Sequence, residues 1–219
     1  GGWSYGKYQL AAKTGSLNEF HSWLKRAHPD MEAQLSAAGG ASAGRAGTEA
    51  YKAAWVQVLG TEAGGAVQSE YAGLQYFVPG AKRIKKGAGL DVMARAFTVQ
   101  QMAFSTAIQH GNGGASSVFR NALKGLGYPP NAVTETNPTD AALIRAVYAE
   151  RRSGNGARYF KKSTQGVRNS VVDRFHNEEA DALRSLEQEI KKAQENPPKA
   201  EPGDNSAATQ TVSPHRGAA

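Results

Sequence analysis

Aromatic and small residues alternate over the first nine positions of the chain, and the pattern then becomes helical. Tyr5 and Tyr8 flank Gly6 in this opening, which is typical of a short strand or one arm of a hairpin. From Ser16 onward hydrophobic residues recur every three or four positions, as on one face of an amphipathic helix. Ser16 and Glu19 also have the spacing of a capping box, in which a hydroxyl and a carboxylate bind free amides of a first helical turn.

Capping residues, glycines and prolines divide the remaining chain into further helices. Thr48 is placed to cap one helix, and either Thr139 or Asp140 to cap another. Residues 38–47 are almost all small and predict a loop. A further hydrophobic pattern predicts a helix that ends before Pro79, because proline interrupts the hydrogen bonds of a helix interior.

The most apolar stretch, residues 99–108, is predicted to be the central buried helix. The segment 109–114 follows it and contains three glycines, which predicts an open loop. A long final helix is expected over 164–194, with Val167 and Ile190 among its inward-facing residues.

These patterns predict a mainly α fold with a short β-hairpin near the N-terminus. Residues 1–195 are expected to form one domain, which at this size buries roughly 70% of its unfolded-chain surface and needs no covalent staples. Residues 196–219 consist largely of Pro, Gly, Ser, Ala and Thr, so we expect a disordered tail there. The chain opens on Gly1 without a preceding Met, which suggests a fragment of a longer protein.

The charge is basic, with 26 Lys and Arg against 19 Asp and Glu and a net charge of +7. Such a surface attracts polyanions, among them nucleic acid, anionic lipid and the bacterial wall. A compact basic cluster either contacts such anions or is a solvated helix face; it consists of Lys82, Arg83, Lys85 and Lys86. Nucleic-acid binding is the least supported alternative, since no helix-turn-helix pattern accompanies the cluster.

Several classes of chemistry have no support in the sequence. Cysteine is absent, which excludes disulfides, thiolate metal sites and cysteine nucleophiles. The five histidines lack metal-ligand spacing, and neither a nucleophile elbow nor a phosphate-binding loop occurs, so we expect no metal and no cofactor. No run of about 18 apolar residues and no signal peptide is visible, so we expect neither a membrane span nor a cleaved leader.

Four segments together resemble the C-terminal lysozyme-like domain of type VI secretion VgrG spike proteins. They are Tyr5–Leu10 (Tyr-Gly-Lys-Tyr-Gln-Leu), Ser105–Gly111 (Ser-Thr-Ala-Ile-Gln-His-Gly), Ile144–Arg151 and Tyr159–Phe160. Related domains occur in phage tail lysins, and the family is distantly similar to chitosanases and lytic transglycosylases. The resemblance implies a lysozyme-like helical domain that cleaves peptidoglycan glycan strands as a muramidase. It also implies spike or tail proteins and an immunity protein as partners, export by that apparatus without a signal peptide, and action in the target cell periplasm.

The resemblance further implies a substrate cleft. In it, Gln9 looks equivalent to the glutamine of the Gly-Leu-Met-Gln element of transglycosylases, and Gln109 and His110 take the place of their Asn-Ala-Gly loop. Tyr5 and Tyr8 each either stack on a sugar or pack inward. Gln9 binds an N-acetyl group or the catalytic acid, or else is a solvated strand residue. His110 lines the cleft or is a packed residue near a helix C-terminus. We expect Gln9 and His110 to face each other across one groove.

The catalytic acid is expected upstream of Gly1, because the family carries it in a Glu-Ser-Gly segment before the hairpin. Glu70 is a weak candidate for a second acid, as are Glu62 and Asp91, although each is better explained as a surface charge. Three acids near the last helix are expected to be solvated partners of Arg174 and Arg184; they are Glu178, Glu179 and Asp181. Whether the domain is a glycosidase or an inactive glycan-binding module therefore stays open. Peptidoglycan versus chitosan, and hydrolysis versus transglycosylation, stay open as well.

Overall fold

A computed structural model of the chain describes residues 2–196, so the tail predicted for 196–219 lies almost wholly outside the described residues. A two-stranded antiparallel hairpin, β1 (Ser4–Tyr5) and β2 (Leu10–Ala11), pairs Tyr5 with Leu10. All other regular elements are helical, which confirms the prediction of a mainly α fold with a short hairpin near the N-terminus. The α-helices are α1 (Ser16–Ala27), α2 (Pro29–Ala37), α3 (Gly40–Ala46), α4 (Glu49–Leu59), α5 (Glu62–Ala72), α6 (Val78–Ala88), α7 (Phe97–Gly125), α8 (Asp140–Arg151) and α9 (Gln165–Glu195). Single turns are η1 (Gly73–Phe77), η2 (Val92–Ala94) and η3 (Pro130–Ala132).

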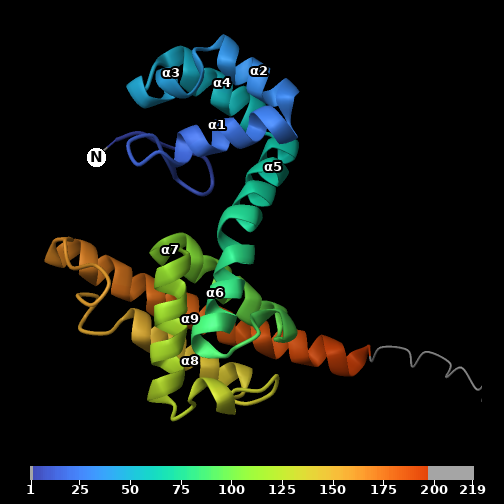
Figure 1. Cartoon of the computed structure of the whole chain (residues 1–219), viewed down its shortest axis with the longest axis vertical. Coiled ribbons are helices and arrows are strands. Elements are labelled where there is room, and N and C mark those ends of the chain that lie inside the picture. Colours follow the sequence, from blue (N-terminus) through green and yellow to red (C-terminus); the bar gives the residue numbers. More distant parts are fainter. Residues whose placement is uncertain (1, 197–219) are drawn as a thin grey trace, which may run out of the picture.

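The helices gather into two lobes with separate hydrophobic cores (Figure 1). The hairpin and α1–α4 form the N-terminal lobe, whose core is aromatic and includes Phe20, Tyr51 and Trp55. The helices α6–α9 form the C-terminal lobe around α7, which buries residues along both of its halves. The central position of α7 agrees with the prediction for residues 99–108, but only one face of this stretch is buried, since Gln101, Phe104 and Ser105 line a hollow on the other. A helical rod of α5, η1 and α6 runs from one lobe to the other (Figure 1).

The predicted helix end before Pro79 is wrong, because the rod continues through this residue. Pro79 lies in the first turn of α6, directly after the π-helical turn η1. A π turn shifts the hydrogen-bond pattern by one residue, and the Gln75 carbonyl, four residues before the proline, accepts from Asn112 Nδ2 at 3.1 Å in place of the amide hydrogen that a proline lacks. The chain therefore passes from lobe to lobe without a loop.

The loops predicted for residues 38–47 and 109–114 are also wrong, because both segments are largely helical. Their glycines permit close packing in the first segment and a kink in the second. In α3, Gly44 lies against Tyr51 so closely that a Cβ would come within 2.7 Å of the ring. In α7 the helix continues past Gln109 and bends at Gly111 alone, at φ 69° and ψ 166°. The capping box is also wrong: Gly15 precedes α1 at φ 96°, and the Ser16 hydroxyl binds the backbone of β2 instead.

The threonine caps are confirmed at Thr48 and Thr139, whose hydroxyls accept from Tyr51 and Ala142 amides. The long last helix is confirmed as well, as α9. Val167 and Ile190 were expected to face inward, but both are about half exposed. They lie toward the two ends of α9, which extends beyond the rest of the lobe (Figure 1).

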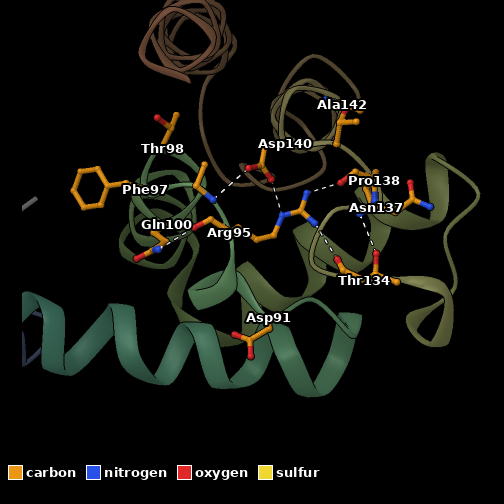
Figure 2. A network of polar contacts seen from close by, with 12 residues as sticks. Asp91, Arg95, Phe97, Thr98, Gln100, Thr134, Asn137, Pro138, Asp140 and Ala142 are labelled. Carbon is orange, nitrogen blue, oxygen red and sulfur yellow. Dashed lines mark hydrogen bonds and ion pairs between the residues drawn. The ribbon is translucent and has the colours of Figure 1, made fainter. Parts of the chain in front are cut away.

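A buried arginine fixes the start of α7 (Figure 2). The Arg95 guanidinium donates to Asp140 Oδ1 at 2.6 Å, to the Thr134 carbonyl at 3.0 Å and to the Pro138 carbonyl. Asp140 in turn accepts from the Ala96 amide, so α8 and the loop before it are tied to the N-terminus of α7. This network positions the helix that carries one wall of the candidate site.

Candidate functional site

The largest hollow described is a cleft of about 770 Å³ between the two lobes. The hairpin and the start of α1 form one wall, α7 and α9 form the other, and Tyr76 of η1 contributes from the rod. The lining side chains are mostly polar or aromatic: Lys7, Tyr8, Gln9, Thr14, Ser16, Tyr76, Gln101, Phe104, Ser105, Gln109, Arg174 and Glu178, together with Ala11 and Ile108. Its size is that of a typical small-ligand site.

The hairpin turn is held in place by Gln68 of α5. Its Oε1 accepts from the Lys7 amide at 2.9 Å, and its Nε2 donates to the Leu59 carbonyl at 2.8 Å. Gly6, at φ 70°, leaves room for this contact, because a Cβ there would lie 2.0 Å from Gln68 Oε1. Gln9, also left-handed at φ 53°, is exposed and donates to the Gly6 carbonyl. The turn thus presents Gln9 to the cleft in a defined conformation.

The two hairpin tyrosines have different surroundings. The Tyr5 ring is 6% exposed and packs on Tyr51 and Trp55, and its hydroxyl donates to the Gly44 carbonyl at 2.7 Å. Tyr8 lines the cleft, donates to Ser69 Oγ and lies 5.9 Å from the Phe104 ring across it. The structure therefore places Tyr5 in the core and Tyr8 at the cleft.

Gln109 and His110 are neighbours in α7 but face different surroundings. Gln109 lines the cleft, and its Oε1 accepts from Arg174. The His110 ring packs on Tyr159 and Phe160, and its Nε2 is covered and has no hydrogen-bond partner among the described residues. Burial and two nearby guanidinium groups lower the pKa of His110 to about 4. The structure thus brings Gln9 and Gln109 to one cleft and leaves His110 out of its lining.

The cleft also contains a carboxylate, Glu178, that the sequence pattern does not identify as a site residue. Glu178 of α9 is 31% exposed, and it is the one carboxylate that lines the cleft among the described residues. Its oxygens accept from Arg174 Nε at 3.2 Å and from Arg151 NH1 at 3.3 Å. The pair with Arg174 has the helical spacing that the sequence shows. Arg151 comes from α8 and is fully buried, and no local pattern revealed that contact.

The other acids considered lie elsewhere. Glu70 of α5 is half exposed and accepts from His28 at 3.0 Å, and Asp91 pairs with Lys85. Neither these residues nor Glu62 lines the cleft. Within residues 2–196, no group of three or more His, Asp or Glu side chains is arranged to hold a metal. No helix in the same range combines the length and apolar character needed to cross a membrane.

A second, smaller hollow adjoins the cleft along α7 and α9. It measures about 380 Å³ and shares Gln101, Ser105 and Glu178 with the cleft. The two hollows therefore lie next to each other, and Glu178 is one of the residues at which they meet. A ligand longer than one ring unit would reach from one hollow into the other.

Fold and site together define a mainly helical domain with a polar cleft between two lobes. The family model for the type VI secretion system spike protein VgrG3-like C-terminal region matches residues 1–179. The chain belongs to this family and is a module associated with the type VI secretion spike. Among curated proteins and among solved structures, no match to the chain was found. Every cleft-lining residue lies within the matched range.

Proposed function

We propose that the cleft binds a glycan strand of peptidoglycan and that the domain is a lysozyme-like glycosidase, a muramidase, of the secretion spike. Exported with the spike, it acts on the wall in the periplasm of the target cell, and an immunity protein protects cells that produce it. One observation carries the proposal: Gln9 and Gln109, the glutamines that the resemblance to lysozyme-like domains marks, line the same cleft from opposite lobes.

The lining of the cleft suits an amino-sugar polymer. Tyr8, Tyr76 and Phe104 offer aromatic faces on which the apolar face of a sugar ring can pack. The amides of Gln9 and Gln109 both donate and accept, as binding of N-acetyl and hydroxyl groups requires. The adjoining hollow extends the groove for further sugar units.

The chemistry requires a carboxylic acid that protonates the leaving oxygen and a second group that assists water or the developing cation. Glu178 already accepts from two guanidinium groups, so it fits the second role better than that of proton donor. In proteins that the chain resembles, the donor lies in a Glu-Ser-Gly segment before the hairpin, and we expect it there.

Two assays on purified wall test the proposal: loss of turbidity and release of soluble muropeptides. They are run on a version extended upstream to include the expected glutamate, with a lysozyme as positive control. Release of muropeptides that a Glu178→Gln variant reduces supports the assignment. A folded extended protein that releases none, while the control lysozyme does, rules out the glycosidase.

The alternative function is a glycan-binding or structural module without catalysis. It is favoured by the absence of any carboxylate other than Glu178 from the described lining of the cleft. Sedimentation with insoluble peptidoglycan tests it on the chain itself. Binding without muropeptide release by the extended protein supports this alternative, and no enrichment over a basic control protein counts against glycan binding in either form.

A further inference from the structure

The lining of the cleft carries an excess of positive charge. Lys7 extends from the hairpin wall, is exposed and forms no ion pair with any described residue. Its Nζ lies 5.6 Å from the centre of the Tyr8 ring, which is itself part of the lining. Arg174, 47% exposed, faces the cleft from α9 on the opposite wall. A cation thus stands on each side of the groove.

Glu178 does not cancel this charge. Its two oxygens are shared between Arg174 and the buried Arg151, so at the main cleft three cationic groups stand against one carboxylate. Asp181, which lines the adjoining hollow, is paired with Arg184. Arg151 Nε and NH2 have no partner among the described residues, so no further acid offsets it. A hollow with low-dielectric walls and one sign of excess charge concentrates its field and attracts ligands of the opposite sign.

Arg174 is also held in a fixed position. Its Nε donates to Glu178 and its NH2 donates to Gln109, which uses two of the five donors of a guanidinium group. The remaining donors have no hydrogen-bond partner among residues 2–196, and the guanidinium geometry matches a carboxylate well. Lys7 is more mobile and acts as a point charge from the other wall.

We propose that Lys7 and Arg174, from opposite walls, attract a free carboxylate carried by the glycan, such as the lactyl carboxylate of an N-acetylmuramic acid without a stem peptide, so that the cleft selects a carboxylate-bearing amino-sugar strand over a neutral or cationic one. This inference rests on the proposed function, since it assumes that the cleft holds a glycan. It names the charge of the ligand and the two residues that recognise it.

Three tetrasaccharides with the same β-1,4 backbone and different charge test the inference by calorimetric titration of the chain. They are the glucosamine tetramer, which is cationic, the N-acetylglucosamine tetramer, which is neutral, and a tetramer alternating N-acetylglucosamine with N-acetylmuramic acid, which is anionic. The anionic tetramer is expected to bind roughly tenfold more tightly than the neutral one at low salt, from about threefold per exposed ion pair. The advantage is expected to shrink as salt rises.

Lys7→Gln and Arg174→Gln are each expected to reduce the preference for the anionic tetramer about threefold. Lys86→Gln, which removes the same charge from the exposed face of α6, is the matched control and is expected to leave the preference unchanged. Because Arg174 also contacts Glu178, Lys7→Gln is the decisive variant, and binding of the neutral tetramer reports whether its cleft is intact.

The outcomes separate the inference from the proposed function. Binding of the neutral and anionic tetramers with equal affinity, or a preference that Lys7→Gln does not change, overturns the inference and leaves a glycan cleft standing. Binding of none of the three tetramers by the folded chain rejects both.

Discussion

The fully buried guanidinium of Arg151 forms an ion pair with Glu178, the carboxylate that lines the cleft, at 3.3 Å. The guanidinium carbon also lies 4.0 Å from the centre of the Phe175 ring. One side chain therefore joins the core of the C-terminal lobe to the wall of the candidate site. Stability of the lobe and placement of Glu178 depend on the same residue.

We expect Arg151→Ala to lower the free energy of unfolding by about 3 kcal/mol, because it removes a buried packing partner and leaves Glu178 without its interior cation. Urea unfolding followed by circular dichroism measures the change. Arg184→Ala, at an exposed residue of the same type paired with Asp181, is the control and is expected to change stability by less than about 0.5 kcal/mol. Equal effects of the two substitutions would show that the buried pair has no special role.

The covered ring of His110 makes stability depend on pH. Because burial and the neighbouring Arg151 and Arg174 lower its pKa to about 4 in the folded chain, the unfolded chain binds a proton first as pH falls. The contribution of His110 is therefore complete above its unfolded pKa of about 6.5 and is lost as pH falls toward 4. The loss is expected to be at most about 3 kcal/mol.

The test measures the free energy of unfolding of the original chain and of the His110→Gln variant between pH 7.5 and 4.5. The difference between the two values is then compared across this pH range. The destabilisation of the variant should be larger at pH 7.5 than at pH 4.5. His176→Gln, at an exposed histidine of α9, is the control for the loss of a histidine that is not buried. A difference between the chain and His110→Gln that is constant over this range would contradict the prediction.

The sequence predicts elements well where the signal is local. Threonine caps at Thr48 and Thr139 depend on a hydroxyl three residues from an amide, and both are confirmed. It fails where glycine or proline has a packing role. Gly44 leaves room for the Tyr51 ring to pack against α3, and Pro79 follows a π turn. Neither feature can be recognised from the residues adjacent in sequence.

The candidate site was predictable in part for the same reason. A resemblance marked Tyr8, Gln9 and Gln109, which the fold brings to one cleft. Glu178 was visible only as a helical partner of Arg174. Its place in the cleft depends on how α8 and α9 pack, and its contact with Arg151 joins residues from those two helices. Such pairings are set by tertiary packing, which periodicity does not report.

Because of the kink in α7, we expect Gly→Ala substitutions at two nearby glycines to change the stability of the chain in opposite directions. Gly111 has φ 69° and ψ 166°, and nothing lies within 4 Å of an added Cβ, so Gly111→Ala adds backbone strain alone. We expect a loss of about 1–3 kcal/mol, because this backbone region is almost restricted to glycine. Gly113 is helical and equally unobstructed, so Gly113→Ala is expected to stabilise the chain by about 0.5–1 kcal/mol. Thermal unfolding of both variants checks the signs, and stabilisation by both would mean that α7 is straight in solution.

Because Tyr5 is buried in the core and Tyr8 lines the cleft, substitutions at the two residues are expected to affect stability and ligand binding separately. Tyr8→Ala removes an aromatic face from the cleft, so affinity for the neutral N-acetylglucosamine tetramer should fall roughly tenfold, from the loss of about 1–1.5 kcal/mol of aromatic contact. Tyr8→Phe keeps that face and should bind nearly as well as the original chain. Tyr5→Phe removes one of the two donors to the Gly44 carbonyl and leaves the Gly47 amide at 3.2 Å, so it should cost about 0.5–1.5 kcal/mol of stability and leave affinity unchanged. Calorimetric titration and urea unfolding of the three variants measure both quantities. If Tyr5→Phe weakened tetramer binding while Tyr8→Ala did not, the cleft between the lobes would not be the glycan site.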